Sequence, residues 1–129
     1  VQNNLFNLGS DLATRIEDRW EGMPLVASSD TTFLESHIDQ WNTDLPNLES
    51  FVLTGGSESA AHLHLSRTVC RIAEREIVKL SRKEEVGEFV VPYVNRLSDA
   101  LFVLSRYVIH LESKEEVLWN PRVGVQESS

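Results

Sequence analysis

Two long segments in the second half of the sequence carry the 3.6-residue periodicity of amphipathic helices. In residues 58–83 apolar side chains return every three or four positions, and residues 89–112 repeat this pattern. Pro92 is compatible with the second segment only in its first turn, so that helix is expected to begin at Phe89 or Pro92. The two segments are joined by the short polar linker "RKEEVGE", which predicts an antiparallel pair of helices.

Each long segment is expected to present one apolar arc to a shared core. We assigned the arcs at about 100° per residue, with Arg67 as the angular reference. The arc of residues 58–83 contains Leu63, Cys70, Ala73, Ile77 and Leu80. The arc of residues 89–112 contains Val90, Leu97, Leu101, Leu104, Val108 and Leu111. The opposite side of the second segment carries a mixed stripe of Asn95, Asp99, Phe102 and Arg106.

Shorter helices are expected in the first half of the chain. Residues 1–15 place three leucines on one helical face, namely Leu5, Leu8 and Leu12. Residues 20–30 have no period and indicate a loop. Thr32 followed by Glu35 fits a capping box, which predicts a helix that starts there and ends before Pro46.

The pattern as a whole predicts an all-α fold, an antiparallel helical bundle in which four helices can be identified. No segment shows the alternation of a β-strand, and no internal repeat is present. Ser57, which follows a pair of glycines, is expected to cap the helix of residues 58–83. Residues 1–129 are expected to form a single domain, with a flexible tail at residues 120–129.

Charge and composition narrow the possible partners. A net charge of -8 and a pI near 4.9 disfavour nucleic acid and anionic membrane surfaces. No apolar run approaches the ~20 residues of a membrane span. The single Cys70 excludes an intramolecular disulfide and indicates a buried, reduced thiol of an intracellular protein. The sequence opens at Val1 inside a helical pattern and without a targeting segment, so further residues are expected upstream.

A ladder of arginines interrupts this acidic background. Arg67, Arg71 and Arg75 recur at a spacing of four, and they span about 12 Å along a helix axis. A polyphosphate has a matching length, and the planar guanidinium group suits phosphate because it donates two parallel hydrogen bonds. The alternative is that Arg67 or Arg71 forms an ordinary surface ion pair with Glu74. Periodicity alone leaves both interpretations open.

The amino-acid sequences of four segments are more specific evidence for a family than their periodicity is. The stretches "FVLTGGSESAAHLHLSRTVCRIAERE" and "YVNRLSDALFVLSRY" resemble the two signature blocks of the ATP:cob(I)alamin adenosyltransferases of the propanediol-utilisation type. The stretches "NNLFNLGSDLAT" and "FLESHIDQW" are similar to the same family, in the same order. The resemblance extends from residue 1 to about residue 119.

The resemblance implies a five-helix bundle of ferritin-like, up-down arrangement, assembled as a homotrimer with ATP and the corrinoid at subunit interfaces. It implies an enzyme that transfers the 5'-deoxyadenosyl group of ATP to cob(I)alamin, forming adenosylcobalamin and triphosphate with Mg²⁺ as cofactor. It also implies a cytoplasmic location, or the mitochondrial matrix in a eukaryote. The product could then pass to an adenosylcobalamin-dependent enzyme, which the sequence does not identify.

Site residues are implied one position at a time. Arg71, Glu74 and Arg75 in "RIAER", together with Asn95 in "VNRLSD", resemble the family's ATP-binding residues. Arg67 resembles an arginine that forms a salt bridge between subunits and supports catalysis alongside Arg71. Phe51 matches an aromatic residue that lies against the corrin and displaces its lower axial ligand. No residue is assigned as a metal ligand.

The sequence departs from the family pattern at three points, of which Ile72 and the missing phosphate loop favour an alternative function. Ile72 replaces a customary arginine, Thr54 replaces a common proline, and the glycine- and lysine-containing phosphate loop has no counterpart in the sequence. We expect Ile72, with Leu65, to lie outside the core and seal a subunit interface. The alternative function is a non-catalytic bundle that binds cobalamin or another protein.

A metal-carboxylate bundle is disfavoured, because it requires inward-facing Glu-x-x-His pairs that the sequence lacks. The histidines are therefore expected at the surface or at an interface. They are His37, His62, His64 and His110. The three tryptophans, Trp20, Trp41 and Trp119, could belong to the core, an interface or a corrin contact.

Overall fold

The computed structural model describes residues 1–45 and 57–112, and all the regular structure in these ranges is helical. The predictions for Phe51, Thr54, Trp119 and the tail at 120–129 lie outside the described residues. The helices are α1 (Gln2–Ala13), α2 (Ser28–Asn42), α3 (Glu58–Ser81) and α4 (Val90–Leu111), with a short 3-10 helix at Ile16–Asp18. No helix within the described ranges has the length and apolar character needed to cross a membrane.

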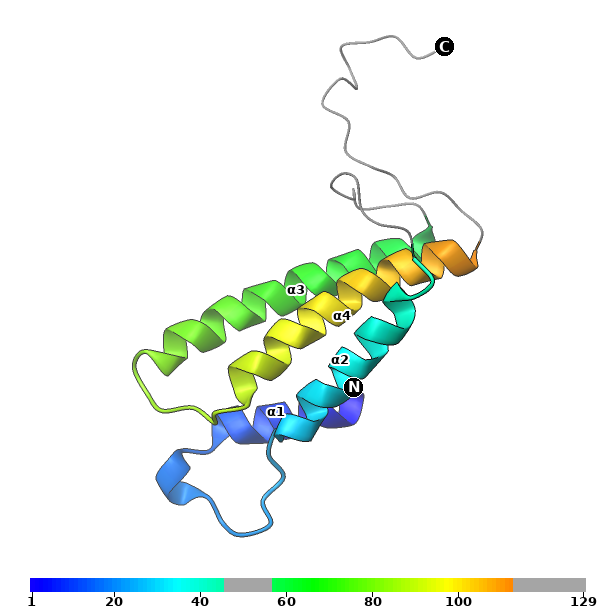
Figure 1. Ribbon diagram of the computed structural model, residues 1–129. Coiled ribbons are helices and arrows are strands. Elements are labelled where there is room, and N and C mark those ends of the chain that lie inside the picture. The colour runs from blue at the N-terminus through cyan, green and yellow to red at the C-terminus, as the bar shows by residue number, and fades with distance from the viewer. Residues whose placement is uncertain (46–56, 113–129) are drawn as a thin grey trace, which may run out of the picture.

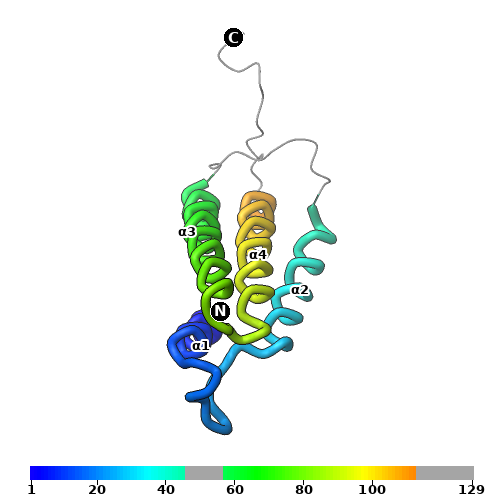
Figure 2. The backbone as a smooth tube through the Cα atoms, turned by 90° about the vertical axis from the view of Figure 1, so that its left-hand side faces the viewer, coloured from blue at the N-terminus to red at the C-terminus, as the bar shows by residue number. Residues whose placement is uncertain are grey.

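The helices form a bundle with α4 in the middle. Figure 1 shows α3 and α4 side by side along their whole length, with α2 on the other side of α4 and α1 crossing one end. Figure 2 shows the same order of α3, α4 and α2 from a second direction. Because α2 and α4 run upward while α3 runs downward, the arrangement is up-down-up. The predicted all-α, antiparallel bundle is confirmed.

The start of α3 follows the predicted capping chemistry. The Ser57 side-chain oxygen accepts a hydrogen bond of 3.1 Å from the backbone N–H of Ala60. The same hydroxyl donates to Oε1 of Glu112 at 2.9 Å, which ties the beginning of α3 to the end of α4. One side chain therefore caps one helix and joins two.

The predicted start of α2 was wrong by about one helical turn. The helix begins at Ser28, and the Asp30 carboxylate accepts a hydrogen bond of 2.9 Å from the backbone N–H of Ala27. Thr32, which we expected to be the cap, lies inside the helix and donates to the Ser28 carbonyl at 3.2 Å. The earlier Asp30 supplies the capping carboxylate, so no cap is needed at Thr32.

The core lies where α4 meets α2 and α3. Its main cluster consists of Val26, Leu34, Cys70, Ile77, Val90, Tyr93, Val94, Leu97 and Ala100. The predicted burial of Cys70, Ile77, Val90 and Leu97 is confirmed, whereas Ala73 and Leu111 are exposed. Arg106, which we placed on the side of α4 away from the core, is only 5% exposed. A helix between two neighbours buries two faces, so a single apolar arc underestimates what α4 covers.

A buried carboxylate fastens α1 to the rest of the molecule. Asp11 is almost fully buried, and its Oδ1 accepts a 2.6 Å charge-assisted hydrogen bond from Arg19. Its Oδ2 accepts a 3.1 Å hydrogen bond from the backbone N–H of Val26. The backbone at Gly87, between α3 and α4, comes so close that an added Cβ would lie 2.5 Å from Oδ1 of Asp11. This contact leaves room only for glycine.

Gly87→Ala is therefore expected to destabilise the fold by about 1 to 3 kcal/mol, because Asp11 is pinned and cannot move away. Gly9→Ala is the matched control, since Gly9 lies inside α1 and an added Cβ would meet nothing within 4 Å. This control should gain up to about 1 kcal/mol from the better helix propensity of alanine. Urea unfolding of both variants measures the difference, and equal stability of the two would contradict the packing argument.

Candidate functional site

A pocket of about 390 Å³ opens along the outer side of the second half of α3. Its lining is Arg71, Glu74, Arg75, Glu76, Val78, Lys79 and Arg82. Four of these side chains are basic and two are acidic, so the lining is net positive on a chain whose overall charge is -8. Local positive charge of this kind can hold an anion that the remaining surface repels.

The pocket brings together three of the residues assigned from the sequence and adds two that sequence reasoning missed. Arg71, Glu74 and Arg75 all line it, and so do Lys79 and Arg82. The signal for the missed pair was available, because the four-residue spacing of the arginine ladder continues at Lys79 and Arg82 lies one turn further on. The row of basic residues therefore continues beyond Arg75 to Lys79 and Arg82.

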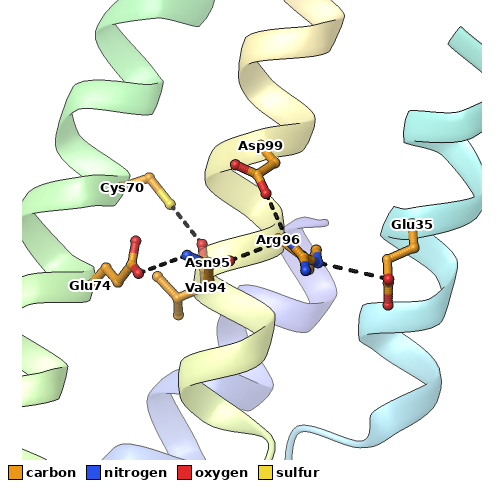
Figure 3. A network of polar contacts seen from close by, with 7 residues as sticks. All are labelled: Glu35, Cys70, Glu74, Val94, Asn95, Arg96 and Asp99. Carbon is orange, nitrogen blue, oxygen red and sulfur yellow. Dashed lines mark hydrogen bonds and ion pairs between the residues drawn. The ribbon is translucent and has the colours of Figure 1, made fainter. Parts of the chain in front are cut away.

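Asn95 joins the site from the neighbouring helix. Its side-chain amide on α4 donates a 3.0 Å hydrogen bond to Oε2 of Glu74 on α3, as Figure 3 shows. The alternative for this segment was a surface ion pair between Glu74 and Arg67 or Arg71. Within the described residues Glu74 forms neither of these ion pairs. The Glu74 carboxylate is held by an amide, and the guanidinium groups of Arg71 and Arg75 stay available at the pocket.

Arg67 lies apart from the other arginines. Its guanidinium carbon is 5.0 Å from the centre of the Phe102 ring on α4, a distance typical of a cation–π contact. Its Nε is buried and has no hydrogen-bond acceptor among the described residues. Arg67 does not line the pocket, so the ladder divides into one arginine held between α3 and α4 and a basic group on the outer side of α3.

The structure places two of the histidines against aromatic rings. No group of three or more His, Cys, Asp or Glu side chains suited to a metal ion occurs in residues 1–45 and 57–112. The expectation that His64 is a surface or interface residue was wrong, because this side chain is only 4% exposed and packs 6.4 Å from the Phe102 ring. His37 lies between Phe33 and Trp41 in a row of ring contacts on α2, at 4.4 and 5.6 Å.

Cys70 is a structural thiol beside the site. Its Sγ donates a 3.5 Å hydrogen bond to the carbonyl oxygen of Val94, across the contact between α3 and α4 (Figure 3). Burial raises the pKa of Cys70 above its ordinary value, the Glu74 charge raises it further, and Arg71 acts in the opposite direction. The folded chain therefore holds this proton more tightly than the unfolded chain, and the associated stability is lost as the pH rises through the raised pKa.

Comparison with known proteins identifies close relatives. The family model described as "Cobalamin adenosyltransferase" matches residues 1–108. A cobalamin adenosyltransferase of Cupriavidus metallidurans is 40% identical over 119 residues, which are 92% of this chain and 61% of that protein. A corrinoid adenosyltransferase of Bacillus subtilis is 43% identical over 108 residues, which are 84% of this chain and 54% of that protein. The chain thus spans about three fifths of the length of these curated relatives.

Solved structures agree with this match. A variant of the PduO-type ATP:corrinoid adenosyltransferase from Lactobacillus reuteri, complexed with cobalamin and ATP, has a TM-score of 0.86 and 37% sequence identity. The match covers 92% of this chain and 66% of that chain. An arginine-to-lysine variant of the same enzyme, complexed with ATP, has a TM-score of 0.85 at 36% identity and the same coverage. The similarity therefore includes nearly the whole chain and is not restricted to α3 and α4.

The Cys70 thiol is expected to react with a disulfide reagent at pH 8 at least about tenfold more slowly in the folded chain than in urea. Burial blocks access to Sγ, and the raised pKa keeps the sulfur protonated. The release of the coloured thiolate from Ellman's reagent measures both rates. Equal rates in the folded and unfolded chain would show that Cys70 is accessible and reactive.

Proposed function

We propose, because the chain belongs to the cobalamin adenosyltransferase family, that the whole protein transfers the 5'-deoxyadenosyl group of ATP to cob(I)alamin. The products are adenosylcobalamin and triphosphate. One observation carries the proposal for this chain: three basic side chains of α3 and Arg82, which directly follows the helix, line one pocket, and Glu74 in its lining is hydrogen-bonded to Asn95. That arrangement suits a nucleotide whose triphosphate follows the axis of α3.

The reaction requires the protein to orient its substrates and to neutralise charge. Cob(I)alamin is itself the nucleophile and supplies the electron pair of the new bond between cobalt and C5'. The C5'–O bond breaks, and its electron pair leaves on the oxygen of triphosphate. Since negative charge develops on this leaving group, Arg71 and Arg75 are proposed to stabilise it, with Lys79 and Arg82 beside them. No side chain has to act as a nucleophile, so orientation of C5' toward cobalt is the remaining task.

Glu74 and Asn95 are proposed to bind the nucleoside part of ATP. A carboxylate next to a triphosphate is unfavourable, whereas a carboxylate next to the hydroxyl groups of a ribose accepts hydrogen bonds. The 3.0 Å hydrogen bond from Asn95 holds Glu74 in place without consuming all of its lone pairs. This division gives the basic residues to the phosphates and the polar pair to the sugar and base.

Mg²⁺ is proposed to arrive with ATP as part of the substrate. Mg²⁺ prefers octahedral coordination by oxygen and usually retains several water molecules, so phosphate oxygens and water can complete its shell. No described residue of this chain is assigned as a ligand.

The corrinoid is proposed to lie against Phe51, which is outside the described residues. The flat side chain would occupy the space of the lower axial ligand, and four-coordinate cob(II)alamin is then reduced more easily to the reactive cob(I) state. The protein is proposed to work in the cytoplasm, or in the mitochondrial matrix if it is eukaryotic. Its product would be passed to an adenosylcobalamin-dependent enzyme.

The protein is also proposed to assemble as a homotrimer with its sites between subunits. Leu65, Val69 and Ile72 form an exposed apolar stripe on α3, with 62%, 58% and 48% of their surfaces accessible. These positions repeat at the spacing of one helical face, and contact with a second copy of the chain would cover them. The unsatisfied Nε of Arg67 supports a salt bridge to a carboxylate outside the described residues.

Replacing Leu65 and Ile72 together by glutamate is expected to dissociate the assembly. Each substitution removes roughly 1.5 to 3 kcal/mol of apolar burial and adds a charge to the contact. Light scattering after size exclusion measures the mass. Ser66→Glu is the matched control, because Ser66 is an exposed residue of α3 that does not belong to the apolar stripe. A wild-type monomer, or a trimer in the double variant, would contradict the proposed interface.

Arg71→Ala is expected to weaken ATP binding by about 2 to 5 kcal/mol, at least roughly thirtyfold, because one cationic partner of the triphosphate is lost. Titration calorimetry measures the affinity, and circular dichroism should show unchanged helical content. Phe51→Ala is the comparison variant, which should bind ATP normally and lose corrinoid turnover. Unaltered ATP affinity in Arg71→Ala would contradict the assigned role.

A further inference from the structure

The side-chain amide of Asn95 has two neighbours of opposite character. Its Nδ2 donates to Oε2 of Glu74 at 3.0 Å, and its Oδ1 accepts from a terminal nitrogen of Arg96 at 3.3 Å. Figure 3 shows Asn95 between these two side chains, with Glu74 on α3 and Arg96 on the side of α2. Asn95 is half-buried, so few other groups compete for its amide.

These neighbours determine which way the amide points. An ionised carboxylate only accepts hydrogen bonds, and a guanidinium group only donates them. If the amide of Asn95 rotated by half a turn, its oxygen would face the Glu74 carboxylate and its NH₂ group would face Arg96. Both hydrogen bonds would then be replaced by repulsive contacts, so only the observed orientation satisfies all three side chains.

Arg96 is itself held from two sides. A terminal nitrogen donates to Oδ2 of Asp99 at 2.7 Å, one turn further along α4. Its Nε lies 3.8 Å from Oε2 of Glu35 on α2. The guanidinium group therefore connects Glu35 on α2 to the Asn95 amide, which in turn holds Glu74 in the pocket lining (Figure 3).

We propose that Arg96 is a positioning residue that fixes the amide orientation of Asn95 for nucleotide binding. The amide of Asn95 then offers its second N–H and its second oxygen lone pair in a fixed order. A ligand must match that order of donor and acceptor. The conformational entropy of the amide is already lost before the ligand binds, so binding does not have to order it. The ligand in this inference is the nucleotide of the proposed function, whereas the orientation of the amide is a property of the chain alone.

The orientation can be tested without any ligand. In the ¹⁵N-labelled protein of full length, the side-chain NH₂ signals of Asn95 are identified by their loss in Asn95→Asp. Arg96→Ala should shift these signals and speed their exchange with water at least about fivefold, since one of two anchoring bonds is gone. Arg15→Ala removes a comparable exposed cation, paired with Glu84 at 4.0 Å, and should leave the signals unchanged. Unchanged Asn95 signals in Arg96→Ala would overturn the inference.

The consequence for binding is tested by calorimetry with ATP and Mg²⁺. Arg96→Ala should raise the Kd about tenfold, and Arg96→Lys should recover most of the loss because lysine still donates to Oδ1. If Arg96 acts through Asn95, the double variant Arg96→Ala/Asn95→Ala should bind no more weakly than Asn95→Ala alone. Arg15→Ala should bind ATP as the wild type does.

The outcomes separate this inference from the proposed function. If Asn95→Ala leaves ATP affinity unchanged, the assignment of Asn95 to the nucleotide site is wrong, whatever Arg96 does. If Asn95→Ala weakens binding but Arg96→Ala does not, the site stands and the positioning role of Arg96 is overturned. Additive losses in the double variant would also overturn it, because they would mean that Arg96 acts independently of Asn95.

Discussion

The antiparallel register between α3 and α4 determines which side chains of the two helices meet. Ten residues along α3, from Ser57 to Arg67, correspond to ten residues back along α4, from Glu112 to Phe102. The next step of seven leads to Glu74 and Asn95. A cap, a cation–π contact and a hydrogen bond of the site thus follow one antiparallel alignment. A slip by a single residue would break all three and turn Asn95 away from the pocket.

Sequence periodicity predicted the helices well because it reports one buried face at a time. It located α3 and α4 almost to the residue and identified Ser57 as a cap. It failed for Arg106, which is buried because α4 has neighbours on two sides, and for His64, which is buried on α3 near the Phe102 ring of α4. Periodicity also could not predict the hydrogen bond between Glu74 and Asn95, since this bond depends on how α3 and α4 are aligned. The assigned roles of these residues came from resemblance, which carries chemistry that spacing alone does not encode.

The basic side chains of the pocket are better suited to binding an anion than to stabilising the fold. Exposed ion pairs contribute little to folding, and here the only close acid–base pair within the lining is Lys79 with Glu76 at 3.5 Å. Among the described residues Arg71 and Arg75 form no ion pair, which is consistent with the proposed role of binding an anion. Their electrostatic effect is local, because the surrounding chain carries a net charge of -8 and repels anions elsewhere. Affinity for a polyphosphate should accordingly fall as the salt concentration rises.

We propose that the basic pocket binds the part of ATP that leaves as triphosphate when cobalt attacks C5'. Phosphorus NMR of the full-length protein with ATP, Mg²⁺ and chemically reduced cobalamin tests it most directly. Intact triphosphate should form in equal amount with adenosylcobalamin. ATP that stays uncleaved while the protein binds cobalamin would contradict it and favour a non-catalytic cobalamin-binding bundle.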